Sequence, residues 1–112
     1  MKITNWLGKV ELNKILDEPG YHFLIFAAKW CGFCTRFVST AAKLDDPTNT
    51  ELLLINADDP DESLWNEYSI RVVPTMVLVK DRNQVFRKDG RSMIGLSESE
   101  LREGLVFLSN AG

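Results

Sequence analysis

The sequence is poor in cysteine, histidine and proline. Its 112 residues include two cysteines, one histidine and four prolines. Two cysteines cannot form the several disulfides that hold small secreted domains together. With only His22 to add a nitrogen, they also fall short of the four ligands of a structural zinc site, so a zinc half-site is a weak interpretation. The cysteine pair is therefore better explained by chemistry than by scaffolding.

An excess of charge of one sign and long apolar runs are also missing. Thirteen basic against sixteen acidic residues give a net charge of −3 without a Lys/Arg block, which argues against nucleic-acid partners and polybasic membrane docking. Apolar runs such as residues 23–28 are far shorter than the roughly 20 residues that cross a bilayer. The first residues lack the unbroken apolar region of a signal peptide. We therefore expect no membrane association and a cytoplasmic protein.

The length and the apolar content fit one domain. Domains usually contain roughly 100 to 200 residues, and 45% of this chain is apolar. No linker, repeat or low-complexity tract interrupts the sequence. We expect residues 1–112 to form one monomeric domain.

Hydrophobic periodicity alternates between strand and helix patterns. Apolar runs predict strands at residues 22–28, 52–55, 76–79 and 85–87, with a further short strand at 2–5, and helical spacing predicts helices around 12–16, 34–44, 64–68 and 101–108. This order favours an α/β fold, one sheet covered on both faces. The strands at 22–28, 52–55 and 76–79 are expected to be joined by right-handed helical crossovers, and the last two strands to be antiparallel because their connection is short.

Polar residues between these segments predict helix starts and a turn. Asp59, followed by Pro60, has the pattern of a helix cap, and capping accounts for the acidic residues of 58–62 better than a calcium loop does. Asn83 is the candidate for the left-handed position of the hairpin at 80–83. Ser97 with Glu100 is a capping-box pattern.

The segment Trp30-Cys31-Gly32-Phe33-Cys34 lies where a buried strand gives way to a helix. A helix N-terminus favours an anion, so Cys31 is the expected nucleophile. Cys34, three positions further, shares the same helix face within disulfide reach and is the expected resolving thiol. The reaction implied is thiol–disulfide exchange: Cys31 attacks a partner's disulfide, and Cys34 then displaces the reduced partner.

Two separate motifs resemble the thioredoxin family over nearly the whole chain. Residues 28–34 look like its Trp-Cys-Gly-Pro-Cys site, and residues 71–75 look like its cis-proline loop. The resemblance implies a thioredoxin fold, a central mixed sheet flanked by helices, with a cis Pro74 against the cysteine pair. It implies disulfide-containing client proteins, electrons from a thioredoxin reductase or another dithiol donor, and no cofactor beyond the redox-active Cys31–Cys34 disulfide.

The proline loop and the active-site motif together suggest a docking surface for clients. A cis proline would turn the backbone of Val73 outward, where it could pair with an extended client segment. Trp30 and Phe33 would form an apolar rim, and Gly95, after Ile94, looks like the family's glycine loop. The predicted client-binding residues are Trp30, Gly32, Phe33, Val73, Pro74 and Gly95.

Three positions depart from the family pattern. Phe33 replaces the proline between the cysteines, so the family's reduction potential cannot be carried over to this chain. The family's buried aspartate aligns with Ile25, and its lysine partner aligns with Leu54. Cys34 would then have to pass its proton to water or to another group, which predicts slower turnover.

Two other functions compete with disulfide reduction. Gly32-Phe33 also resembles the Cys-Gly-Phe-Ser motif of monothiol glutaredoxins, which implies glutathione and an iron–sulfur cluster bridging two chains; Trp30 and the lack of a Gly-Gly pair before the last helix argue against it. The second is a thioredoxin-fold interaction module that docks partners without turnover. The presence of both cysteines argues against that module. His22 is expected to be a strand-edge surface residue without a catalytic role.

Overall fold

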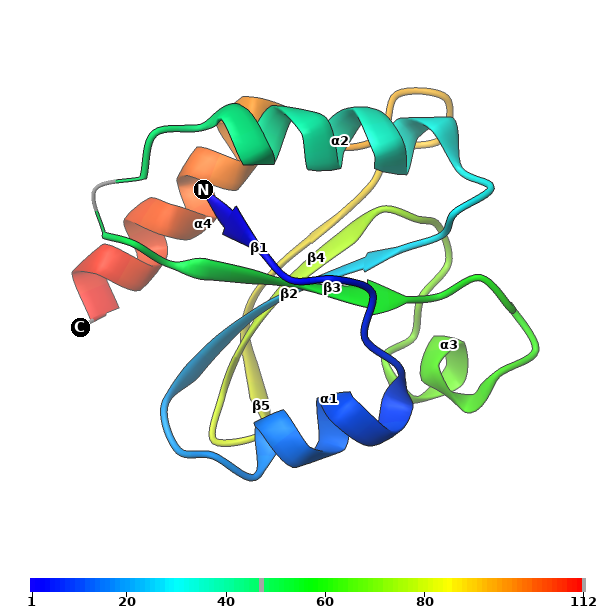
Figure 1. The fold of residues 1–112 in the computed structure, drawn as a ribbon, viewed down its shortest axis with the longest axis horizontal. Helices are drawn as coiled ribbons and strands as arrows, with labels where there is room; N and C mark the ends of the chain where they lie inside the picture. The colour runs from blue at the N-terminus through cyan, green and yellow to red at the C-terminus, as the bar shows by residue number, and fades with distance from the viewer. Residues whose placement is uncertain (47, 112) are drawn as a thin grey trace.

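The computed structural model describes residues 1–46 and 48–111, so Pro47 and Gly112 of the predicted domain lie outside the described residues. Strands and helices alternate along this part of the chain up to the fourth strand, which the fifth strand follows directly (Figure 1). In order they are β1 (Lys2–Ile3), α1 (Lys9–Leu16), β2 (Tyr21–Ala27), α2 (Gly32–Lys43), β3 (Glu51–Asn56), α3 (Ser63–Glu67), β4 (Thr75–Lys80), β5 (Asn83–Asp89) and α4 (Glu98–Ala111). None of the described helices is long and apolar enough to span a membrane.

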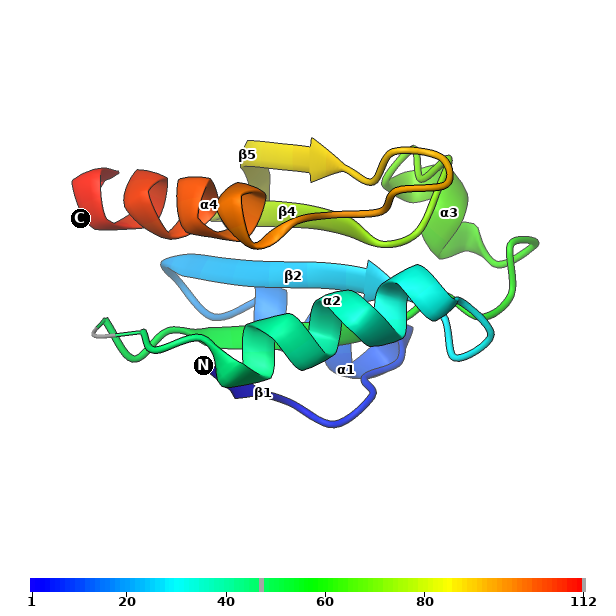
Figure 2. The same ribbon diagram turned by 90° about the horizontal axis from the view of Figure 1, so that it is seen from above.

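A single mixed sheet organises the molecule, with the strand order β1-β3-β2-β4-β5. β3 runs parallel to both β1 and β2, whereas β4 is antiparallel to β2 and to β5. Helices α2 and α4 cover one face of this sheet, and α1 and α3 cover the other (Figure 1). Seen from above, α2 lies over the β1–β3 side of the sheet and α4 over the β4–β5 side (Figure 2). The prediction of a sheet covered on both faces is confirmed.

The direction of β4 differs from the sequence prediction, which joined β3 and β4 by a helical crossover. Thr75, the first residue of β4, pairs with Phe26, close to the pair formed by Ala27 and Asn56 at the end of β3. The chain therefore returns to the sheet at the same end from which it left. The five-residue helix α3 is only about 7–8 Å long at 1.5 Å per residue, too short to carry the chain back along a strand of about 20 Å.

The predicted cap at Asp59 is wrong. Helix α3 begins at Ser63, with Glu62 as its cap residue and no side-chain cap bond. The Asp59 side chain instead accepts the N–H of Asp61 at 2.9 Å, which closes a local turn of the type that aspartate favours. The cap motif and the turn motif use the same short side chain, so the sequence alone did not separate them.

One sequence prediction is wrong at the β4–β5 hairpin, and one is confirmed at the start of the last helix. The left-handed positions of the β4–β5 turn are Asp81 (φ 49°) and Arg82 (φ 68°), and Asn83 already belongs to β5. Positive φ at both central residues is the requirement of a two-residue hairpin turn. The capping box is confirmed: the Glu100 N–H donates to Ser97 Oγ at 3.3 Å, and the Ser97 N–H donates to Glu100 Oε1 at 3.2 Å.

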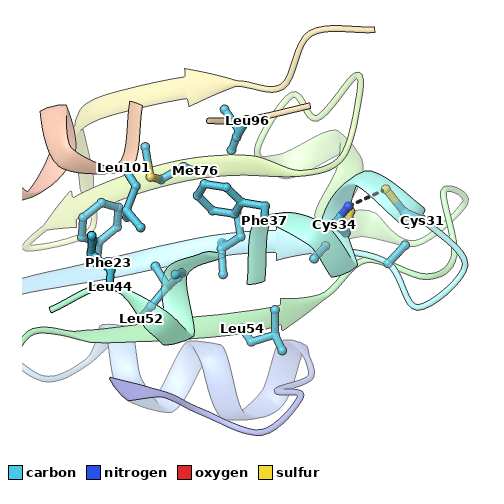
Figure 3. Packing of buried hydrophobic residues seen from close by; sticks show 14 of the residues in the cluster. Phe23, Cys31, Cys34, Phe37, Leu44, Leu52, Leu54, Met76, Leu96 and Leu101 are labelled. Carbon is cyan, nitrogen blue, oxygen red and sulfur yellow. Dashed lines mark hydrogen bonds between the residues drawn. The ribbon is translucent and has the colours of Figure 1, made fainter. Parts of the chain in front are cut away.

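The near-continuous apolar sequence of β2 fills the core on both faces of the sheet. Because successive side chains of a strand point to opposite faces, Phe23 and Ile25 pack with α2 and α4, and Leu24 and Phe26 pack with α1 and α3. Figure 3 shows Phe23 and Phe37, from β2 and α2, in the first of these layers. This layer extends to the two cysteines, so the site rests directly on the core.

Gly104 of α4 lies against this layer, and a larger residue there is expected to destabilise the protein. A Cβ added at Gly104 would lie 2.5 Å from Cζ of Phe23, which is only 2% exposed. We expect Gly104→Ala to strain the core by about 1–3 kcal/mol; alanine's helix propensity offsets about 1 kcal/mol of this, which leaves a net loss of stability of up to about 2 kcal/mol. The free energy of unfolding in urea measures this loss.

Gly32→Ala in α2 is the matched control. A Cβ at Gly32 would meet nothing within 4 Å, so this variant should be as stable as the wild type or slightly more stable. If Gly104→Ala matches Gly32→Ala in unfolding free energy, the proposed close packing of Phe23 on α4 is contradicted.

Candidate active site

Cys31 occupies the N-cap of α2, after the carboxyl end of β2. Its backbone is extended (φ −99°, ψ 112°), and its Sγ accepts the backbone N–H of Cys34 at 3.2 Å (Figure 3). Capping by a side-chain acceptor satisfies one of the free N–H groups of the first helical turn. The residue is only 7% exposed, but it belongs to the lining of a groove. The structure therefore places Cys31 at the N-terminus of a helix, as the sequence predicts.

Cys34 lies within the first turn of α2 and is only 1% exposed. Both cysteines are free thiols. Burial raises the pKa of the Cys34 thiol far above its ordinary value, and the hydrogen bond with Cys31 raises it further. Cys34 is therefore a protonated thiol at neutral pH. It needs a proton acceptor before it can attack another sulfur.

The two positions that depart from the family's buried aspartate and lysine are apolar and buried. Ile25 and Leu54 are register partners in β2 and β3, and both belong to the buried cluster that contains Cys34. Ile25 is 0% exposed and Leu54 6% exposed. Neither of these two side chains can accept a proton from Cys34, with which they share a buried apolar cluster.

The proline loop lies against Cys31. The Val73–Pro74 peptide bond is cis, which confirms that prediction. The Cys31 thiol donates to the carbonyl oxygen of Val73, with a sulfur–oxygen distance of 3.6 Å. The Thr75 hydroxyl donates to the Val72 carbonyl at 2.8 Å and holds the start of the loop. Residues about forty positions apart in the sequence are therefore in direct contact.

Trp30 is exposed at the rim, and Asp58 fixes the segment that carries it. Trp30 is 61% exposed, and its indole Nε1–H donates to the carbonyl oxygen of Asp58 at 2.8 Å. The Lys29 N–H donates to Asp58 Oδ1 at 2.6 Å. Asp58 therefore orders the loop before Cys31 and does not cap a helix, contrary to the sequence prediction for the acidic run. The parallel pairing of β2 with β3 could have indicated this contact, since their carboxyl ends meet at one edge.

Besides Gly32 in the cysteine motif, two more glycines lie near the site, and only Gly95 of these was predicted from the sequence. Gly95 (φ 79°) lies against Phe33, because a Cβ there would be 2.9 Å from the Phe33 Cβ. The glycine beside the proline is Gly90: its N–H donates to the Pro74 carbonyl at 2.9 Å, and an added Cβ would lie 2.4 Å from that oxygen. Gly90 directly follows β5. The position of Gly90 at the end of a strand is the sequence feature that could have indicated its role.

A groove of about 420 Å³ passes over Cys31. It is lined by residues 30–33, 71–73 and 91–93 and by Trp65. Four of the predicted client-binding residues therefore lie in its walls: Trp30, Gly32, Phe33 and Val73. Pro74 and Gly95 are buried behind these walls. The segment 91–93 was not part of the sequence prediction.

Other polar candidates lie away from this groove. His22 is the second residue of β2, at the end of that strand opposite to Cys31, and its Nε2 lies 2.9 Å from the Glu18 carbonyl oxygen. Among the described residues, no group of three or more His, Cys, Asp and Glu side chains could hold a metal ion.

The sheet, its two helical layers and a cysteine pair at a helix N-terminus beside a cis proline define a thioredoxin-like redox protein. A comparison with protein-family models gives the same result, because the family model Thioredoxin matches residues 6–102. The chain belongs to the thioredoxin family, and the predicted thioredoxin fold is confirmed.

Individual relatives show how far the similarity extends. Thioredoxin 2 of Plasmodium falciparum is 36% identical over 67 residues, covering 59% of this chain and 43% of that protein. A thioredoxin of Aspergillus fumigatus is 27% identical over 99 residues, covering 88% and 87% of the two chains. The X-ray structure of Fasciola hepatica thioredoxin has a TM-score of 0.69 at 26% identity, covering 96% and 99%. For three curated relatives, the chain spans less than half of the relative's length.

Proposed function

We propose that the protein reduces disulfides of client proteins by thiol–disulfide exchange, with Cys31 as nucleophile and Cys34 as resolving thiol. The observation that carries the proposal is the placement of Cys31 Sγ at the N-cap of α2, 3.2 Å from the Cys34 N–H and open to a groove. The N–H group and the helix dipole both favour negative charge at this sulfur. The thiolate is the attacking species in thiol–disulfide exchange.

The two cysteines supply both electrons that the client disulfide takes up. The Cys31 thiolate attacks one sulfur of the client disulfide, and the other client sulfur leaves as a thiolate that takes up a proton. Cys34 then loses its proton and attacks Cys31, which releases the second client thiol. The client gains two electrons, and the protein is left with a Cys31–Cys34 disulfide. No further cofactor is needed, and a thioredoxin reductase or another dithiol donor would restore the two thiols.

Client docking on the groove explains how the sulfurs would meet. An extended client segment beside Val73 could pair with its backbone, which tolerates many client sequences. Trp30 and Phe33 would flank this segment, Gly32 would leave room for it, and Pro74 and Gly95 would shape the walls from behind. A monomeric state, a single domain 1–112 and a cytoplasmic location stay predictions.

Reduction of insulin with dithiothreitol as electron donor tests this function. We expect the protein to raise the rate at least about tenfold over dithiothreitol alone, because the Cys31 thiolate is held beside the client groove. The control is the double variant Cys31→Ser, Cys34→Ser, which should match dithiothreitol alone. A wild type that is no faster than this variant would contradict disulfide reduction, and partner binding retained by the double variant would instead support an interaction module.

The same assay separates the glutaredoxin-like alternative. With glutathione as the sole reductant, the protein is expected to be inactive, and after anaerobic reconstitution with iron and sulfide it is expected to be colourless. Activity with glutathione, or a bound chromophore, would favour the glutaredoxin-like function over the proposed one.

A further inference from the structure

The loop of residues 91–95, which ends at the Gly95 that resembles the family's glycine loop, contributes Arg91, Ser92 and Met93 to the groove wall. It is closed on itself: the Arg91 N–H donates to the Gly95 carbonyl at 3.1 Å, and the Gly95 N–H donates to the Arg91 carbonyl at 2.7 Å. Met93 lies between them with φ 66° and is 81% exposed. A left-handed backbone is uncommon for such a side chain. The closed loop therefore holds a large, exposed apolar side chain in the lining of the groove that also contains Cys31.

The loop of residues 91–95 packs against Phe33. Gly95 packs against the Phe33 Cβ so closely that a side chain at Gly95 would not fit. The Arg36 guanidinium lies 5.1 Å from the centroid of the Phe33 ring and donates to the Ile94 carbonyl at 2.8 Å. Phe33, which stands where the family has a proline, thus connects the cysteine motif to the loop. Through these contacts Phe33 and Arg36 support the loop that carries Met93.

The charge of the groove comes from arginines. Arg71 and Arg91 belong to its lining, which contains no acidic residue among the described ones. Arg91 is paired with Glu100 at 2.8 Å. Arg71 is exposed, and within the described part of the chain it forms no ion pair or side-chain hydrogen bond. The groove therefore presents one uncompensated positive charge, at Arg71, and exposed apolar side chains at Met93 and Trp30.

We propose that this groove selects client segments whose disulfide cysteine is flanked by an acidic residue and an apolar residue. The acidic side chain pairs with Arg71, and the apolar side chain contacts Met93, whose flexible thioether adapts to different shapes. Charge complementarity of this kind acts on association rate and on partner choice. The inference rests on the proposed disulfide exchange, since it concerns the clients of the same cysteine.

Synthetic peptides with a single cysteine in a mixed disulfide with thionitrobenzoate test the selection. Attack of Cys31 on the peptide sulfur releases the coloured thionitrobenzoate anion, and Cys34 then releases the peptide thiol. Two peptides differ only in a glutamate or a lysine next to the cysteine. We expect the second-order rate constant to be about tenfold larger for the acidic peptide at low ionic strength. In about 0.5 M salt the ratio should fall below about two.

Variants of Arg71 and Met93 test whether these residues produce the preference between peptides. Arg71→Gln should reduce the ratio between the two peptides to below about two, and Arg71→Glu should invert it. Met93→Ser should lower the rate for a peptide with leucine beside the cysteine by about fivefold, with less effect when that leucine is serine. Arg102→Gln is the matched control, because this arginine pairs with Glu98 on α4 outside the groove lining. It should leave both ratios unchanged.

The outcomes separate this inference from the proposed function. Equal rates for the acidic and basic peptides, with efficient reduction of both, overturn the client selection and leave disulfide reduction intact. A preference for the acidic peptide that survives in Arg71→Gln also overturns it, because the charge then acts elsewhere. Failure to react with either peptide, while dithiothreitol does react, contradicts the proposed function itself.

Discussion

Replacing Cys31 with serine is expected to lower the rate of disulfide reduction by at least about a thousandfold, because a serine hydroxyl is a weak nucleophile without an activating base. No histidine could act as that base, since His22 lies at the other end of β2. Replacing Cys34 with alanine should leave the first exchange within about threefold of the wild type. The backbone N–H that faces Cys31 Sγ is kept in this variant, and stable mixed disulfides should accumulate.

The asymmetry between the two variants is the decisive observation. Single-turnover release of thionitrobenzoate from a small aromatic disulfide measures the first exchange, and mass spectrometry counts the trapped mixed disulfide. Urea unfolding of both variants checks that the fold is intact. If the Cys34 variant loses the first exchange while the Cys31 variant keeps it, the assigned roles are reversed. If both variants keep it, the reaction does not pass through this pair.

Local patterns in the sequence were sufficient to predict most of the helices and strands. The helical spacing of α2 and α4, the apolar run of β2 and the capping box at Ser97 each depend on neighbours within a few residues. These elements were predicted with boundaries close to the observed ones. The cis geometry at Pro74 came from the family resemblance, because a proline by itself is cis in only about 5–6% of cases.

Features set by distant contacts could not be predicted in the same way. The direction of β4 depends on the end of the sheet at which the chain stands after the short helix α3. The apolar sequence of β4 suits either direction. Asp58 and Gly90 act on the site through backbone contacts with Lys29 and Pro74. Such contacts appear only when the ends of separate strands are brought together. The groove wall at Met93 was missed for the same reason.

Release of the client is expected to depend steeply on pH, because burial raises the pKa of the attacking Cys34 thiol. Well below the pKa of a thiol, its thiolate fraction rises tenfold with each pH unit, so the rate should rise about a thousandfold between pH 6 and pH 9. The sign follows from the chemistry: deprotonation is required for attack, and a raised pKa makes the thiolate scarcer at low pH. Quenched-flow measurements on a purified mixed disulfide at Cys31 give this rate directly.

The profile also shows whether any group of the protein accepts the Cys34 proton. A proton acceptor that titrates near neutrality would produce a plateau above its own pKa, so a rate that levels off below pH 8 contradicts transfer to water. Ile25→Asp sharpens the test, with the neutral Ile25→Asn as its matched control. A carboxyl at this fully buried position faces Leu54 and not a lysine. Desolvation would keep it protonated, so both variants should retain the steep profile, and a large acceleration by aspartate alone would show that a buried carboxylate can serve Cys34 without a cationic partner.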